Sequence, residues 1–148
     1  MILLDLIGGE QTSRLIIMMK SRPHTGLTGE LQFVVEQRHV IDFATGGMPA
    51  VLSTPNLIGL LERTAREALA PLLEPDEHTV GMEIELRHLA PTPLGARVTA
   101  TVRVIHAEGR QVTFQVEAHD EHELILRGIH KRTVIHTGSF AKRVQAKS

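Results

Sequence analysis

The chain has 148 residues, of which 42% are hydrophobic and 22% charged, with a formal net charge of -1; this size and composition are typical of one compact globular domain. Because 16 basic residues nearly balance 17 acidic ones and Trp and Tyr are absent, the chain offers neither a positive field nor a stacking surface for nucleic acid. The absence of cysteine excludes disulfides, thiolate metal sites and a cysteine nucleophile, and fits a reducing cytoplasm.

The first 20 residues, "MILLDLIGGEQTSRLIIMMK", form an apolar leader of uncertain role. Charges and glycines interrupt it, so it falls short of the roughly 20 apolar residues that span a bilayer. It also lacks the basic start and small-residue cleavage site of a secretory signal. We therefore expect no membrane partner, a cytoplasmic location, a loosely attached leader over residues 1–20, and a single domain over residues 21–148.

A short strand is expected at "LQFVVEQ", residues 31–37, because this stretch is β-branched and partly alternating. The glycine-containing stretch "FATGGMPAVLSTP" then leads into a helix, for which Thr54 is the expected cap and Pro55 the first helical residue. Pro71 and Pro75 end the helix. Its apolar stripe has a spacing of 3.6 residues and consists of Leu57, Ile58, Leu61, Ala65, Ala68, Leu69 and Leu72.

After the helix the hydrophobic period changes from 3.6 to 2. Alternation in "TVGMEIELRHLA", "ARVTATVRVIHAE" and "RQVTFQVEAHDE" predicts three strands. A fourth is expected at about residues 123–135, where Gly128 indicates a bulge or close packing. Short turns favour antiparallel pairing, so we expect an α+β fold in which a curved sheet wraps around one long helix. The basic end "FAKRVQAKS" is expected to be frayed.

Three side chains are candidates for chemistry. Glu62 lies at the edge of the apolar stripe, and Thr54 is eight residues before it, about two helical turns away. His88 shares a strand face with apolar residues and should point toward the helix. A hydroxyl, a carboxylate and an imidazole at one boundary would suit acyl transfer.

Each candidate also has an ordinary structural interpretation. Thr54 could simply cap the helix, Glu62 could be an exposed acid paired with Arg66, and His88 could be a satisfied histidine at the core margin.

Metal binding is not expected. His119 and His122 in "HDEH" have the look of a polar turn, and His130 and His136 would lie about 20 Å apart along an extended strand. No serine nucleophile elbow, zinc protease motif or phosphate-binding loop is present.

The stretches "AVLSTPNLIGLLERTA", "HTVGMEIELRHLAPTPLG", "FQVEAHDE" and "GIHKRTVIH" together resemble the hotdog-fold thioesterases, specifically the fluoroacetyl-CoA thioesterase-like group. The resemblance covers about residue 51 to the C-terminus. It implies an acyl-CoA thioesterase with Thr54, Glu62 and His88 as the catalytic set. It also implies that Arg132 lies near the active site or the CoA moiety, and that the Gly81 backbone holds the thioester carbonyl.

The resemblance further implies a homodimer with acyl-CoA bound near the subunit interface, and no cofactor besides CoA, which is part of the substrate. Fluoroacetyl-specific members carry phenylalanines in the lid before the catalytic Thr, whereas this chain has "TGGMP" at residues 45–49, with Phe43 the nearby aromatic residue. A short or medium acyl group is therefore expected rather than a fluorinated one.

Two alternatives remain open from the sequence. One is a non-catalytic hotdog module that binds acyl-CoA or another apolar ligand. The other is a hydratase, which is disfavoured because no Asp lies between Phe43 and Pro75.

Overall fold

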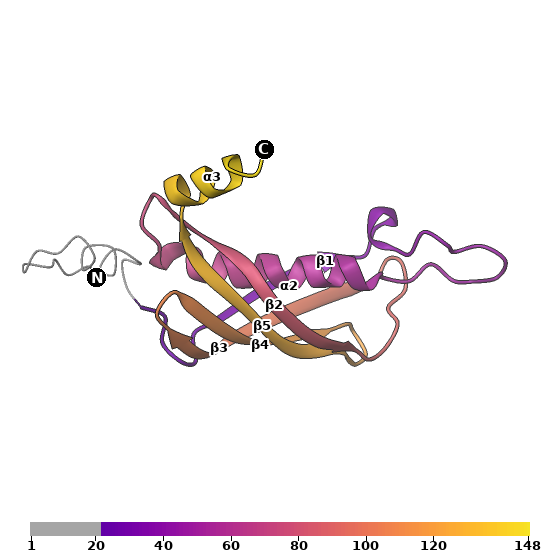
Figure 1. Cartoon of the computed structure of the whole chain (residues 1–148). Helices are drawn as coiled ribbons and strands as arrows, with labels where there is room; N and C mark the ends of the chain where they lie inside the picture. Colours follow the sequence, from indigo (N-terminus) through magenta and orange to yellow (C-terminus); the bar gives the residue numbers. More distant parts are fainter. Residues whose placement is uncertain (1–21) are drawn as a thin grey trace, which may run out of the picture.

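The computed structural model describes residues 22–148, so the predicted leader over residues 1–20 lies outside the described residues. One five-stranded antiparallel sheet curves around a long helix, which confirms the expected α+β architecture (Figure 1). The strand order is β1-β3-β4-β5-β2. The strands are β1 Thr28–Val34, β2 Glu77–His88, β3 Arg97–Glu108, β4 Gln111–His119 and β5 Leu124–His136. The helices are α2 Thr54–Leu69 and α3 Thr137–Gln145, with short 3-10 turns η1 Gln37–His39 and η2 Ala70–Leu72.

Helix α2 supplies one wall of the core. Its apolar stripe is rotated slightly from the predicted one, because Leu60 and Thr64 are buried whereas Ile58 is only partly buried. Burial of Thr64 is compatible with its polarity, since its hydroxyl donates to the Leu60 carbonyl at 2.7 Å. No helix within residues 22–148 is both long and apolar enough to cross a membrane.

The start of α2 differs from the prediction by one residue. Ser53, not Thr54, is the N-cap, and its hydroxyl accepts from the Asn56 backbone N–H at 3.4 Å. Ser and Thr are both good caps, so composition alone could not choose between these neighbours. Because Ser53 caps the helix, the Thr54 hydroxyl is available for another partner.

Strand β2 forms one edge of the sheet and pairs with β5. The register shifts between Gly81 and Glu83, which marks a bulge. Beyond it, Ile84 lies opposite His130 and His88 opposite Leu126, so these side chains share the helix-facing side of the sheet.

Gly128 brings β5 close to β2, as its position in the sequence indicated. A side chain there would collide with the backbone of Glu85 and Leu86. The predicted close packing is therefore confirmed, while the bulge lies in β2 instead.

Both ends of the described chain depart from expectation. Strand β1 begins at Thr28, three residues before the predicted strand, because Gly29 lets the strand approach Ala68 of α2 closely. The predicted frayed end instead forms helix α3 after β5.

The loop between η1 and α2 extends away from the sheet (Figure 1). Bridges between Val40 and Leu52 and between Val51 and Pro93 close its base. Gly46 and Gly47 have positive φ angles of 62° and 90°, which glycine adopts readily. This loop reaches α2 beside the Thr54 hydroxyl.

Candidate active site

The first polar cluster joins the start of α2 to the end of β2. The Thr54 hydroxyl lies 2.8 Å from Nδ1 of His88, although the two residues are 34 positions apart. The direction of this hydrogen bond depends on which ring nitrogen carries the proton. The structure thus brings together two of the three predicted catalytic residues.

Burial distinguishes His88 from a surface histidine. Its Nε2 atom is buried and has no hydrogen-bond partner within residues 22–148. Desolvation lowers the pKa of His88 from its ordinary value of 6.5, and a hydrogen bond with the Ala90 backbone opposes this effect. The neutral imidazole is therefore favoured at neutral pH, in which one nitrogen can accept a proton.

An apolar depression of about 400 Å³ opens beside this pair. Its walls include Phe43 and Met48 from the extended loop and Leu89 after β2. These three side chains are 59%, 42% and 46% exposed, which is high for large apolar residues. The depression is suited to an apolar group attached to a carbonyl near Thr54 and His88.

Another depression, of about 510 Å³, is lined by β1, β3 and β4. Glu30, Arg103 and Glu117 line it, and it contains none of the predicted site residues. We therefore assign the chemistry to the smaller depression, which adjoins the Thr54–His88 pair.

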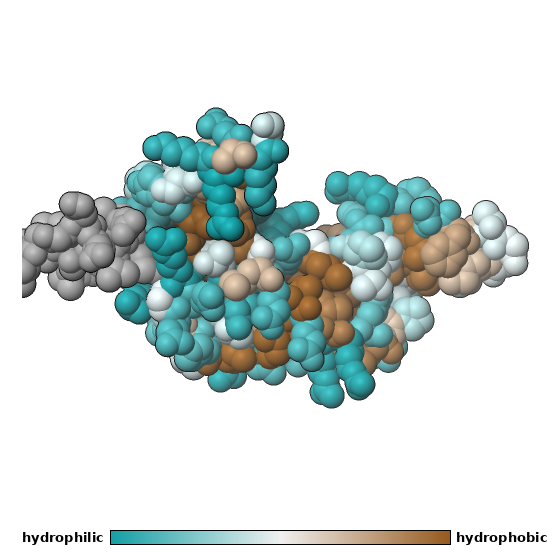
Figure 2. Space-filling view, viewed as in Figure 1, coloured by the Kyte–Doolittle hydropathy of each residue, from teal (hydrophilic) through white to brown (hydrophobic). Residues whose placement is uncertain are grey.

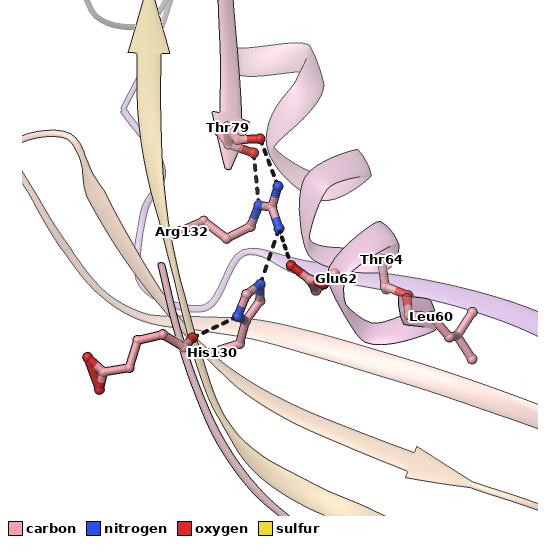
Figure 3. Close-up of polar contacts among 7 residues, drawn as sticks. Leu60, Glu62, Thr64, Thr79, His130 and Arg132 are labelled. Atoms are coloured by element: carbon pink, nitrogen blue, oxygen red, sulfur yellow. Dashed lines mark hydrogen bonds and ion pairs between the residues drawn. The ribbon is translucent and has the colours of Figure 1, made fainter. Parts of the chain in front are cut away.

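The second polar cluster surrounds Glu62 in the middle of α2. The Oε2 atom of Glu62 lies 3.6 Å from the NH1 atom of Arg132 on β5. The Glu62 side chain is 45% exposed, whereas that of Arg132 is only 5% exposed. The ion-pair partner of Glu62 is thus Arg132 rather than the Arg66 of the ordinary helical interpretation, and Glu62 lies at the edge of the core (Figure 3).

Arg132 is held by three further contacts. Its Nε donates to the Thr79 hydroxyl at 2.9 Å, its NH2 to the Thr79 carbonyl at 2.7 Å, and its NH1 lies 3.2 Å from Nε2 of His130. Burial lowers the pKa of Arg132, while Glu62 raises it. A guanidinium stays charged under such shifts, so a fixed positive charge faces the Glu62 carboxylate.

Gly81 lies close to the Glu62 carboxylate. A Cβ atom at residue 81 would lie 2.5 Å from Oε2 of Glu62 and 3.3 Å from the His130 ring. Only glycine leaves this space free, and Gly81 stands at the bulge of the edge strand. Gly81 and Arg132, expected near the site from the resemblance, both lie beside Glu62.

The two clusters do not touch within one chain. Thr54 and Glu62 are eight residues apart on one helix, which separates them by about 12 Å at 1.5 Å per residue. No hydrogen bond or ion pair within residues 22–148 links Glu62 to Thr54 or His88. Within one subunit the two clusters are therefore separate and do not form one connected network.

Sequence reasoning missed two contributors to the second cluster, Thr79 and His130. A signal for His130 did exist, because residues 128, 130, 132 and 134 alternate on one strand face and place His130 beside Arg132. No group of three or more His, Cys, Asp or Glu side chains in the described part of the chain is arranged to hold a metal ion.

Comparison with known proteins agrees with this architecture. Residues 35–138 match the profile of the family described as fluoroacetyl-CoA-specific thioesterase. The fluoroacetyl-CoA thioesterase of Streptantibioticus cattleyicolor is 40% identical over 100 residues, which is 68% of this chain and 72% of that protein.

Solved structures show the same fold. A crystal structure of a mutant of the fluoroacetyl-CoA-specific thioesterase FlK has a TM-score of 0.81 at 34% identity, covering 87% of this chain and all of that one. A hot-dog-like protein from Thermanaerovibrio acidaminovorans has a TM-score of 0.77 at 28% identity, covering 83% of this chain and 91% of that one. These similarities confirm the expected hotdog fold and thioester hydrolase class, and the chain belongs to the fluoroacetyl-CoA thioesterase family.

Proposed function

We propose that this acyl-CoA thioesterase hydrolyses short or medium acyl thioesters to the free acid and CoA, with Thr54, Glu62 and His88 as its catalytic set. The observation that carries the proposal is the position of the Glu62 carboxylate, which buried Arg132 holds beside the Gly81 backbone. An acid in this arrangement is preorganised for chemistry rather than solvated on a helix surface.

The proposal includes a homodimer joined along β2. This strand lies at the edge of the sheet, spans 12 residues, and exposes Met82 and Ile84, which are 48% and 36% exposed. Figure 2 shows apolar side chains gathered on the face that carries β2 and β5. An exposed apolar edge strand is a ready surface for pairing with a second copy.

Dimerisation would bring the two polar clusters into one site. A two-fold axis makes the paired β2 strands antiparallel, so the His88 end of one strand runs toward the Gly81 end of the other. Glu62 would then face the Thr54–His88 pair of the partner subunit. This arrangement accounts for the separation of about 12 Å within each subunit.

Two chemical routes are compatible with this site. In one, Glu62 or His88 takes a proton from water, whose oxygen adds to the thioester carbonyl before the C–S bond breaks and CoA leaves. In the other, the Glu62 carboxylate adds directly, releases CoA and forms an anhydride that water then cleaves. In both, Thr54 orients the reacting group and backbone N–H donors near Gly81 stabilise the oxyanion.

The apolar depression supports the proposed acyl range. Its apolar wall combines the Phe43 ring, the flexible Met48 side chain and aliphatic residues such as Leu89. The lid stretch of residues 45–49 contains no phenylalanine, so we propose no preference for a fluorinated acyl group. The proposed chemistry uses groups of the protein and water, without a further cofactor, and the cysteine-free composition supports a cytoplasmic location.

CoA release from a panel of short, branched, aromatic and fluorinated acyl-CoA thioesters tests the proposal. We expect turnover of short or medium members and at least about a hundredfold loss in Glu62→Gln, because a positioned acid or base commonly contributes that much. Binding of acyl-CoA without CoA release would instead indicate the non-catalytic ligand-binding module. Turnover that survives in Glu62→Gln would remove Glu62 from the mechanism.

A further inference from the structure

His130 is a buried histidine that the proposed mechanism leaves unused. It lies on β5, is 1% exposed, and occupies the strand face that also carries Arg132. A buried polar ring is costly unless both nitrogens find partners. The hydrogen-bond partners of the two ring nitrogens therefore indicate the role of His130.

Those partners fix the tautomer. Nδ1 of His130 lies 3.0 Å from the carbonyl of Glu83, and a carbonyl only accepts, so Nδ1 carries the proton. Nε2 lies 3.2 Å from NH1 of Arg132, and a guanidinium only donates, so Nε2 is the acceptor. The ring is therefore a neutral imidazole that bridges the bulged edge strand to Arg132 (Figure 3).

The remaining donors of Arg132 show why this contact matters. Nε and NH2 are both directed at Thr79, which anchors one side of the guanidinium. NH1 is the atom that faces Glu62, and it is also the atom that His130 accepts from. Without the hydrogen bond to His130, the NH1 atom of Arg132 would be held less firmly in its position next to Glu62.

We propose that His130 is a positioning residue, whose neutral ring, protonated at Nδ1, holds Arg132 so that NH1 orients the Glu62 carboxylate beside Gly81. This inference rests on the proposed catalytic role of Glu62. It adds a residue that never touches the substrate yet fixes the geometry of the group that does.

Burial of His130 favours the neutral ring. His130 faces Arg132 on its own strand, Glu62 on α2, and the Glu83 carbonyl on β2. Desolvation is the largest effect and lowers the pKa of His130 from 6.5, and Arg132 lowers this pKa further. The Glu83 carbonyl and Glu62 act in the opposite direction and raise it. The positioning function is complete above this lowered pKa and is lost as the pH falls through it.

Two amide substitutions separate positioning from simple strand support. In His130→Gln the longer amide can reach the place of Nε2 and accept from Arg132, whereas in His130→Asn the shorter amide can only replace Nδ1 and donate to the Glu83 carbonyl. We expect kcat of His130→Asn to fall at least about tenfold with KM little changed, since small misplacements of a reacting group are costly. His130→Gln should retain kcat within about threefold.

Equal activity of the two variants, whether both are high or both are low, would overturn the positioning role. Nitrogen-15 NMR of the wild-type histidines provides a readout that does not depend on turnover, and we expect a neutral His130 with its proton on Nδ1 at about pH 7. A proton on Nε2 would refute the inference even if a variant failed to fold. Full activity of Glu62→Gln would refute the proposed catalytic role of Glu62, while the tautomer measurement would still test the hydrogen bonds of His130.

Discussion

The two polar clusters along α2 are built in different ways. Glu62 is supported by Arg132, whose guanidinium is anchored by Thr79 and His130 on two paired strands. Thr54 and His88 contact each other at the base of an extended loop, beside exposed apolar side chains. The first cluster is thus held by several contacts within its own chain, whereas the second borders an open apolar depression.

We expect both clusters to take part in the chemistry, and the apolar loop beside the second cluster to set the selectivity for the acyl group. A group that must meet a carbonyl in one orientation gains from a buried, multiply bonded support. A surface that accepts different acyl groups gains from loop residues that can vary without disturbing the sheet. The substitutions below test which residues act in the reaction and which ones select the acyl group.

The largest effect should come from Thr54, because the structure separates its hydroxyl from helix capping. We expect Thr54→Ala to lower kcat by about a hundredfold, as losing a positioned proton-transfer or orienting group does. Its stability should stay close to wild type, since Ser53 is the cap. Steady-state kinetics and thermal denaturation measure the two quantities.

Ser53→Ala is the matched control. It should cost about 1 kcal/mol of unfolding free energy through loss of the cap and leave kcat within a few-fold. If Thr54→Ala were destabilised while Ser53→Ala were not, the cap assignment would be wrong. Thr54→Ser should keep most of the activity, and an inactive Ser variant would contradict the role of the hydroxyl.

Gly81→Ala should have the next largest effect. Its methyl group would lie 2.5 Å from Oε2 of Glu62 and displace the carboxylate. We expect kcat to fall about tenfold or more, because the displaced group no longer reaches its reacting geometry.

Gly59→Ala provides a control on the same helix as Glu62. Nothing lies within 4 Å of a Cβ at Gly59, so this change should leave activity unaltered and stabilise the helix by about 0.5–1 kcal/mol. Normal activity in Gly81→Ala would show that the close approach to Glu62 is unimportant.

The pH dependence of stability probes both clusters together. His88 and His130 each have a pKa lowered from 6.5, so below that pH the unfolded chain binds more protons than the folded one. Their neutral forms therefore contribute full stability above pH 6.5, and stability falls as the pH drops from there through the lowered values. Thermal denaturation across this range should show the loss, and His130→Gln should show a smaller one.

The smallest effect is expected at the loop. Met48 is 42% exposed and lines the apolar depression, so Met48→Ala should raise KM for medium acyl-CoA by about threefold with little change for acetyl-CoA. An equal change for both substrates would argue against acyl contact at this wall.

The sequence predicted the helix, the sheet and the three catalytic candidates because these depend on local periodicity and short motifs. The 3.6-residue spacing after Pro55 and the alternation in β3 and β4 are confirmed. In β2 the bulge after Gly81 interrupts the predicted alternation. The cap at Ser53 was missed because adjacent Ser and Thr offer the same capping chemistry. Helix α3 was missed because its polar, basic sequence resembles a frayed end.

The contacts of Glu62 could not be predicted from the residues near it in the sequence. Its ion-pair partner Arg132 is 70 positions away in the sequence. The contacts of His130 depend on the β2–β5 register and on the bulge in β2. Helical spacing indicates only partners within the helix, such as Arg66 four residues after Glu62. It cannot indicate an ion pair that tertiary structure forms with another element. Catalytic roles for Thr54, Glu62 and His88 remain predictions until variants are measured.

The most direct test of the shared site is subunit complementation. Purified heterodimers of Glu62→Gln and Thr54→Ala subunits, carrying different tags, should regain about half the wild-type rate of CoA release, because one of the two composite sites is then intact. A heterodimer of wild type with the double variant should be inactive, since each site then lacks one group. An inactive first heterodimer with a half-active second one would show that each subunit holds a complete site, and would contradict the account.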